Sequence, residues 1–300
     1  MEFSDETKHD RTYGQRQMRN RGLDTAVIGS AFPEGIVEAL SDLFDVIVMP
    51  PDPKLPLQVA GHADLSVSVI SGNLFVRKDY YENAAKEKID LIILRKGLKL
   101  RLLPYLAGSE YPADCGLCAK PVYVASSVNP VDNLSCSGDE LRENRRPVIF
   151  ASKGATYPEL TGVALKDPSG SGERMPSSSE EDDLPALILV RQGYSACAAA
   201  ACADGALITS DRGIAFAASR AGIPCLIIRK GHISLPGYGD GDGGFIGGAS
   251  GLFGDRLFFS GDPLTHPDGA VIYDFCREHK TKPVPLAGGK LFDGGGIIFP

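Results

Sequence analysis

The sequence predicts an α/β fold in which five similar units form a ring. Two distant segments share the expected order of strand, strand, helix and strand, and their last parts are nearly identical: Asp90–Leu100 is DLIILRKGLKL and Pro224–Leu235 is PCLIIRKGHISL. Repetition at a fixed period indicates a repeat architecture. The candidate unit starts are spaced by 49, 83, 51 and 49 residues, at positions 61, 110, 193, 244 and 293.

The two ends of the chain provide a further observation. The unit that begins at position 293 has only its first strand before Pro300, whereas Thr25–Pro50 contains a strand, a helix and a strand. Pairing of the N- and C-terminal segments completes this unit and closes the ring, which removes exposed sheet edges. The predicted fold is therefore a closed five-unit α/β propeller.

A single domain is expected over residues 23–300. Residues 1–22 are charged throughout and contain no apolar segment that could act as a signal peptide, so a disordered tail is expected there. The 83-residue spacing contains a low-complexity insert at about residues 165–185. This insert is rich in Ser, Gly, Pro and acidic residues, a composition that cannot form a core.

Local patterns justify the first elements in order. Ala26–Ile28 and Asp45–Met49 are apolar runs of strand length, and the amphipathic segment between them predicts a helix that ends near Phe44. In Gly61–Val76, the turn residues around Gly72 separate two strands. The following KDYYENAAKEK segment predicts a helix, and Asp90–Leu100 the next strand.

The second half is predicted in the same way. Strands are expected at Ser195–Ala203 and Ala206–Thr209, followed by a helix at Gly213–Arg220 and a strand at Pro224–Ile228. Thr265 is expected to cap the closing helix. Two histidines near this helix are expected to be exposed: His266 and His279.

A ring of five such units resembles the pentein superfamily. These α/β propellers include arginine and agmatine deiminases, the dimethylarginine hydrolases and the anti-association initiation factor of archaea and eukaryotes. The segments GFIGGASG (Gly244–Gly251), THPD (Thr265–Asp268) and the final GGII (Gly295–Ile298) are also similar to those of a bacterial domain family of unknown function. The resemblance covers about residues 25–300.

The resemblance implies a modified pentein site. In the pentein enzymes a Cys attacks the guanidinium carbon, a His moves protons and carboxylates hold the cation. The Gly-rich run Gly294–Pro300, where the family Cys is expected, has no thiol, and the position of the family His is Phe245 or Ile246. The implied function is binding of a small polar or guanidino-type metabolite in the central channel, without the usual Cys nucleophile. This favours a protein that is not an enzyme.

The candidate binding residues are polar side chains at the unit starts, which the resemblance places around the channel. A His two residues before an Asp can form a charge-assisted pair that moves a proton or holds a polar ligand. A hydrogen-bonded pair at a strand end, without a ligand, is the alternative. The candidate set is His62, Asp64, Asp114, Cys115, Tyr194, Cys197 and Asp293.

Two other functions stay open. One is a hydrolase or transferase with a rearranged catalytic set, in which Cys197 or Cys115 is the nucleophile beside His62 and Asp64. The other is a non-enzymatic protein-interaction module. The C-x-x-C formed with Cys118 has the spacing of a zinc or redox pair, but no second C-x-x-C or H-x-x-H accompanies it. Buried core cysteines, no metal and no cofactor are therefore expected.

Composition limits the partners. The net charge of −7 and pI of about 5.3 argue against nucleic acid as a partner. No apolar run reaches the roughly 18 residues of a membrane span. The odd count of 7 cysteines in a chain of 300 residues predicts reduced thiols in the cytoplasm. The expected partner is a small molecule, and a homodimer stays open.

Overall fold

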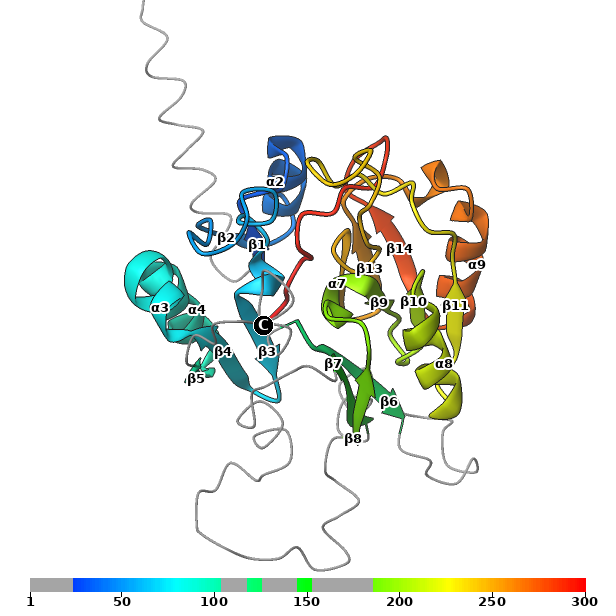
Figure 1. The fold of residues 1–300 in the computed structure, drawn as a ribbon, viewed down its shortest axis with the longest axis horizontal. Helices are drawn as coiled ribbons and strands as arrows, with labels where there is room; N and C mark the ends of the chain where they lie inside the picture. The colour runs from blue at the N-terminus through cyan, green and yellow to red at the C-terminus, as the bar shows by residue number, and fades with distance from the viewer. Residues whose placement is uncertain (1–23, 104–117, 126–144, 153–185) are drawn as a thin grey trace, which may run out of the picture.

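The computed structural model describes residues 24–103, 118–125, 145–152 and 186–300 (Figure 1). Within these ranges the chain has a mixed α/β fold with small sheets, as the sequence predicts. The tail expected at residues 1–22 and the insert expected at about residues 165–185 lie outside the described residues. Asp114 and Cys115 lie outside them too.

Four sheets in the described ranges share one pairing pattern. In each, the first strand is antiparallel to the second and the second is parallel to the third. Their strands are β3 (Val67–Ile70), β4 (Asn73–Arg77) and β5 (Lys99–Leu103); β6 (Lys120–Ala125), β7 (Arg145–Ser152) and β8 (Ala186–Val190); β9 (Ala199–Ala201), β10 (Leu207–Thr209) and β11 (Cys225–Ile227); and β12 (Ser250–Phe253), β13 (Arg256–Phe259) and β14 (Lys282–Pro285).

A fifth sheet lies near the two chain ends. Strands β1 (Thr25–Gly29) and β2 (Asp45–Met49) are parallel, with Thr25 opposite Asp45. An isolated antiparallel bridge joins Val27 to Ile298, with N···O distances of 2.8 and 2.9 Å. In Figure 1 the end of the chain runs between the blue and cyan part and the green, yellow and orange part. The described strands form separate sheets and no closed sheet.

Where the structure describes the connection between two parallel strands, a helix makes the crossover, because a parallel pair cannot be joined by a tight turn. These helices lie at the periphery in Figure 1, outside the sheets. In α8, Ile214 and Ala218 are one turn apart and both are buried, which anchors this face on the core. The crossover helices include α2 (Glu34–Ser41), α4 (Lys86–Lys96), α8 (Arg212–Arg220) and α9 (Gly269–Glu278).

The predicted strand at Asp90–Leu100 is wrong. Residues up to Lys96 belong to α4, in which Ile89 and Ile92 are buried at helical spacing. Gly97 ends the helix in the left-handed conformation (φ 65°), and its N–H donates to the Ile93 carbonyl at 2.8 Å. The similar segment Pro224–Leu235 does contain a strand, β11, because the preceding helix α8 has already ended at Arg220, before Gly222 with φ 71°. Similar sequences therefore form different elements.

Two smaller predictions also change. The strand expected from Ser195 begins with a short helix, α7 (Ser195–Ala198), and only Ala199–Ala201 is a strand. Thr265 belongs to a 3-10 turn, η4 (Pro263–Thr265), and α9 begins at Gly269.

The histidines expected at the surface are not exposed. His266 is 2% exposed, its ring packs edge-on against His232 at 5.6 Å, and its Nδ1 accepts the Asp268 N–H at 3.0 Å. His279 has 13% of its side chain exposed and its Nδ1 lies 2.9 Å from a carboxylate oxygen of Asp204. Polar partners within the fold therefore hold both rings away from solvent.

A buried ionic network holds the segment that precedes β3. Arg77, which is 1% exposed, donates to Asp52 at 2.9 Å. The Ser66 hydroxyl donates to the other oxygen of Asp52 at 2.6 Å, and the backbone N–H of Asp52 donates to the Ala60 carbonyl at 2.7 Å. Because removal of one partner would leave a buried charge, this network fixes the segment firmly.

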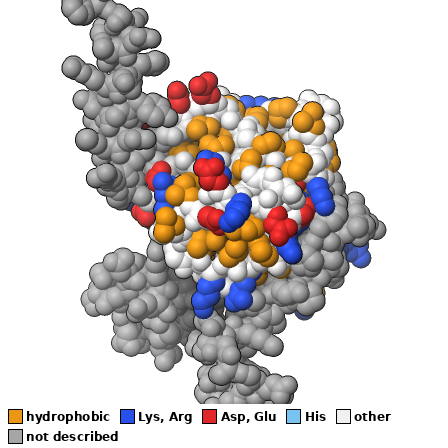
Figure 2. Space-filling view, turned by 90° about the vertical axis from the view of Figure 1, so that its left-hand side faces the viewer, with side chains coloured by type: hydrophobic (Ala, Val, Ile, Leu, Met, Phe, Trp, Pro, Cys, Tyr) orange, Lys and Arg blue, Asp and Glu red, His pale blue; other side chains and the backbone are white. Residues whose placement is uncertain are grey.

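The face seen in Figure 2 carries mixed side chains. Acidic, basic and hydrophobic groups are interspersed on it, and neither sign of charge dominates. On α4, an ion pair joins Lys86 to Asp90 across one helical turn, and Leu94 is exposed beyond it. Among the described residues, no helix is both long and apolar enough to cross a bilayer.

Candidate functional site

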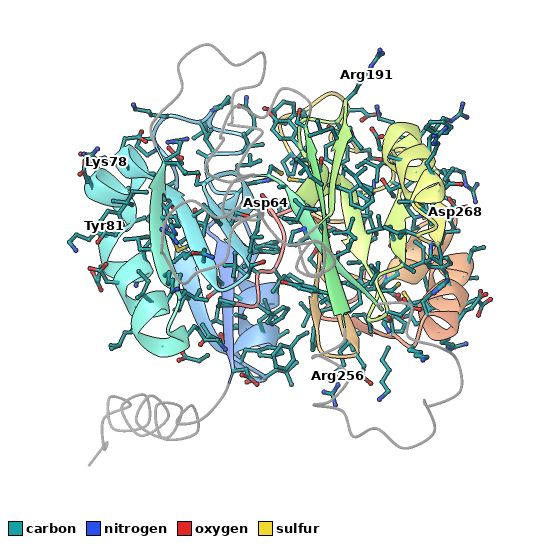
Figure 3. The ribbon with its side chains drawn as sticks, turned by 90° about the horizontal axis from the view of Figure 1, so that it is seen from below. Asp64, Lys78, Tyr81, Arg191, Arg256 and Asp268 are labelled. Carbon is teal, nitrogen blue, oxygen red and sulfur yellow. The ribbon has the colours of Figure 1, made fainter. Side chains whose placement is uncertain are left out.

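Polar side chains meet in the interior, and each stands close before the first strand of a sheet or before the bridge at Ile298. Cys197 lies in α7, ahead of β9. Figure 3 shows Asp64 in the middle of the molecule, between its two groups of sheets. We call the set the central cluster: His62, Asp64, Cys118, Cys197 and Asp293, all of them at most 6% exposed.

Two thiols and a carboxylate form one side of the cluster. The Cys197 thiol donates to Oδ2 of Asp64 at 2.7 Å. Sγ of Cys118 lies 3.4 Å from Sγ of Cys197. Oδ1 of Asp64 is buried and has no hydrogen-bond partner within the described part of the chain.

Asp293 forms the other side. Its Oδ2 accepts the N–H of Phe245 at 2.8 Å and its Oδ1 accepts the N–H of Gly295 at 3.2 Å. Nδ1 of His62 lies 3.7 Å from Oδ1 of Asp293. The pair of His62 with Asp64 expected from the sequence is therefore replaced by a pair with Asp293.

Glycines let the backbone pass close to these carboxylates. A Cβ at Gly248 would lie 2.5 Å from Cγ of Asp293. A Cβ at Gly295 would lie 2.6 Å from Cβ of His62 and 2.9 Å from Oδ1 of Asp64, and Gly295 has φ 86°. The GFIGGASG segment and the final glycine run are thus needed for close packing against the cluster.

Burial controls the protonation of the acidic and imidazole groups. Desolvation raises the pKa of Asp64 to about 6. Desolvation, together with the nearby charge of Asp64, raises the pKa of Asp293 to about 7. Desolvation lowers the pKa of His62 to about 4. At neutral pH the imidazole is therefore uncharged and does not neutralise the carboxylates.

Burial also shifts the pKa values of the Cys197 thiol and the Lys120 amine. The hydrogen bond with Cys118, burial and the Asp64 charge raise the pKa of the Cys197 thiol well above its ordinary value. Lys120, the first residue of β6, has its pKa lowered by burial, although the charge of Asp64 acts in the opposite direction. Cys197 is therefore a protonated, weakly nucleophilic thiol in this structure.

The structure brings together four of the seven residues selected from the sequence: His62, Asp64, Cys197 and Asp293. Tyr194, a fifth, lies beside them, half-buried in an apolar group that includes Cys118 and Cys197. The other two, Asp114 and Cys115, lie outside the described residues.

Two residues of the site were missed. Cys118 was assigned to the core, and Lys120 was not selected. Their position at the start of an apolar strand is the signal that could have identified them, since Cys118 lies just ahead of β6 and Lys120 is its first residue. Phe245 contributes its backbone N–H, which no side-chain pattern reveals.

Residues 178–298 match a family of unknown function. The match includes α7, the glycine segment at 244–251 and Asp293, so it covers part of the central cluster. The family has no assigned activity, and its match agrees with the resemblance that the sequence indicates. No curated protein matches the chain in sequence.

Solved structures similar to the chain have the pentein fold. A dimethylarginine dimethylaminohydrolase, solved as an adduct with S-methyl-L-thiocitrulline, matches 88% of this chain and 93% of its own, with 9% identity and a TM-score of 0.44. An agmatine deiminase from C. jejuni matches 96% and 84%, with 11% identity and a TM-score of 0.41. An amidinotransferase of saxitoxin biosynthesis from Microseira wollei matches 88% of each chain, with 10% identity and a TM-score of 0.40.

Proposed function

We propose that the central cluster binds a small organic cation with a planar guanidinium or amidinium head. One observation supports this most strongly: two buried carboxyl groups, Asp64 and Asp293, lie near enough for the charge of one to raise the pKa of the other. A buried carboxylate is costly unless it is paired, so a cation between these groups would stabilise both.

The side chains beside Asp64 and Asp293 neutralise the negative charge of these carboxylates only in part. His62 is beside Asp293, but its lowered pKa of about 4 leaves it neutral at pH 7. Lys120 interacts electrostatically with Asp64, but burial lowers the pKa of the Lys120 ammonium group. A ligand cation would lower the pKa of both carboxyl groups, and binding at pH 6–7 would release protons because the groups are partly protonated there.

The free oxygen favours a planar head. Among the residues that the structure describes, Oδ1 of Asp64 has no hydrogen-bond partner, whereas its Oδ2 already accepts from Cys197. Guanidinium and amidinium groups present several N–H donors in a plane and match carboxylates well. A compact ammonium ion would not satisfy two carboxylates in this way.

The function that we propose is binding of the organic cation without covalent attack on it. The Cys197 thiol carries a raised pKa and is bonded to a carboxylate, which is the opposite of the electropositive setting of reactive cysteines. The glycine run at Gly294–Gly296, where the resemblance implies a nucleophile, lies beside Asp64 and His62 and has no side chain to supply one.

Closure of a five-unit propeller is also part of the proposal. The bridge between Val27 and Ile298 supports it, because Ile298 occupies the place beside β1 that a first strand occupies in the other sheets. A small molecule as partner, a cytoplasmic location and a homodimer stay predictions. The net charge of −7 and the mixed charges in Figure 2 speak against nucleic acid.

Thermal unfolding with and without ligand tests the proposal. Arginine, agmatine, methylated arginines and benzamidine would be compared with butylamine, and hits would be titrated by calorimetry. A ligand at a hundred times its dissociation constant stabilises by about 2.7 kcal/mol, which gives a clear shift in Tm. We expect shifts with the planar cations and not with butylamine.

Matched variants locate the site. Asp293→Asn should reduce the affinity of a planar cation, because it removes a charge that faces the ligand. Asp274→Asn is the control, since Asp274 is exposed on α9 and pairs only loosely with Arg277 at 3.6 Å. Absence of binding by every planar cation, or equal loss in both variants, would overturn the proposal.

A further inference from the structure

We propose that Asp64, Cys118 and Cys197 form a binding site for a thiophilic divalent cation, with Zn²⁺ as the best fit. One potential ligand atom from each residue lies within 4.8 Å of the other two, and all three residues are buried. This inference shares Asp64 with the organic-cation site but does not depend on it. The sequence predicts no metal site, so this site is inferred from the three-dimensional structure alone.

The distances are close to those of a tetrahedral zinc site. With Zn–S bonds of about 2.3 Å, two thiolates of a tetrahedron are about 3.8 Å apart, and a sulfur and an oxygen are about 3.5 Å apart. Sγ of Cys118 and Sγ of Cys197 are separated by 3.4 Å, and Sγ of Cys197 is 2.7 Å from Oδ2 of Asp64. Side-chain movements of less than ~1 Å would therefore admit an ion.

The backbone already holds the two thiols in place. The N–H of Ala196 donates to the carbonyl of Cys118 at 2.9 Å, which ties α7 to the start of β6. The N–H of Gly248 donates to the carbonyl of Cys197 at 2.9 Å. Ligands whose backbone is already held in place lose little entropy when a metal binds.

Asp64 provides a second, independent indication of a ligand. Its Oδ1 is buried and has no hydrogen-bond partner in the described ranges, and a buried oxygen without a partner is uncommon in folded proteins. A metal bound by the carboxylate would satisfy this atom. In the metal-free state the Cys197 proton occupies the hydrogen bond to Oδ2, so metal binding would release the two thiol protons to solvent.

The divalent ion offsets most of the ligand charge. Two thiolates and one carboxylate carry three negative charges, and the ion supplies two positive charges. Lys120 interacts electrostatically with all three ligand residues. A bound cation therefore reduces the cost of burying these groups.

The donor set selects among metals. Mg²⁺ and Ca²⁺ require oxygen ligands and fit poorly with two sulfurs. Zn²⁺ accepts sulfur and oxygen together in a tetrahedron, and three protein ligands leave a fourth position for water or a small molecule. Co²⁺ adopts the same geometry and is a spectroscopic probe for it.

The test is a titration of the reduced, metal-free full chain with Co²⁺, followed by displacement with Zn²⁺. We expect one equivalent to give thiolate-to-cobalt charge-transfer absorption and tetrahedral ligand-field bands. Cys118→Ser and Cys197→Ser should each lower the affinity at least tenfold, since even indirect partners of ligands cost about that much. Cys225→Ser, which removes a thiol outside the cluster, should leave the spectrum unchanged.

A measurement on the unmodified protein covers the case in which a variant fails to fold. X-ray absorption of the zinc-loaded chain should show two sulfur neighbours at about 2.3 Å and oxygen at about 2.0 Å. A shell of oxygen and nitrogen only, or a cobalt spectrum that survives both serine substitutions, would overturn the proposal.

The two proposed sites can fail separately. Asp293→Asn should reduce binding of the planar cation and leave the cobalt spectrum intact, because Asp293 is not a ligand in the proposed metal site. Cys118→Ser should have the reverse effect. Among these variants, only Asp64→Asn is expected to weaken binding of both the planar cation and the metal.

Discussion

The thiol of Cys197 donates a 2.7 Å hydrogen bond to the carboxylate of Asp64, a residue 133 positions earlier in the chain. The bond spans two sheets, since Asp64 precedes β3 and Cys197 precedes β9. It also links their protonation: the bond lowers the pKa of Asp64, whereas the Asp64 charge raises the pKa of Cys197.

The first prediction concerns this bond. Cys197→Ala should move the pKa of Asp64 above its value of about 6, because the donor that stabilises the carboxylate is lost while burial remains. Carbon NMR of selectively labelled Asp side chains would measure the titration. An unchanged or lower pKa would show that the thiol does not donate to Asp64 in solution.

The second prediction is a pH dependence of stability. The folded-state pKa of Asp293 is raised from 3.8 to about 7, so the folded state binds the proton more tightly. This contribution to stability is fully present below pH 3.8 and is lost as the pH rises through about 7. The free energy of unfolding of wild type relative to Asp293→Asn should therefore decrease by up to ~4 kcal/mol across this window.

Chemical denaturation at several pH values would measure that difference. The comparison between variants matters because His62 acts in the opposite direction: its pKa is lowered from 6.5 to about 4, so its contribution is lost as the pH falls. Both proteins contain His62, and its effect largely cancels in the difference. A flat difference between pH 4 and pH 7 would contradict the raised pKa of Asp293.

The third prediction concerns the glycine run. Gly295→Ala should destabilise the protein by ~2 kcal/mol or more, because the new Cβ would lie 2.6 Å from Cβ of His62 at a backbone φ of 86°. Gly35→Ala is the matched control: Gly35 is in α2 with no atom near the added methyl group, and helix propensity predicts a gain of ~1 kcal/mol. Denaturant unfolding of both variants gives the comparison.

The fourth prediction tests the contact between the chain ends. Val27 and Ile298 exchange two backbone hydrogen bonds, so both amides should exchange slowly with deuterated solvent. Ile298→Pro removes one donor and should speed the exchange of the Val27 amide, as measured by hydrogen exchange with NMR. Fast exchange of both amides in the wild type would show that the ends do not pair.

In the described residues, the sequence correctly predicted a helix or a strand where the apolar pattern and the length of the segment indicated the same element. Asp45–Met49 is Asp45 followed by four apolar residues, and it forms β2 over these same residues. The failure at Asp90–Leu100 has a physical cause: the apolar run LIIL fits a strand or a buried helix equally well, and the preceding charged helix simply continues through it. Periodicity over so few residues does not separate the two.

The predicted pairing of His62 with Asp64 was wrong because it relied on their spacing in the sequence. His62 and Asp64 would lie on one face if both were in a strand, which has a period of two residues. Asp64 instead lies in a 3-10 turn with three residues per turn, so the two side chains diverge and His62 meets Asp293. The pairing of Cys118 with Cys197 joins separate sheets, and no local pattern contains that information.

The order of the cluster residues along the chain has a consequence during synthesis. His62 and Asp293 are separated by 231 positions, and at 5–20 residues per second the ribosome needs roughly 10–50 s to pass from one to the other. During that interval a nascent chain holds Asp64 without its counterpart carboxylate. The proposed ligand site is therefore complete only in chains whose translation has passed the last of these residues.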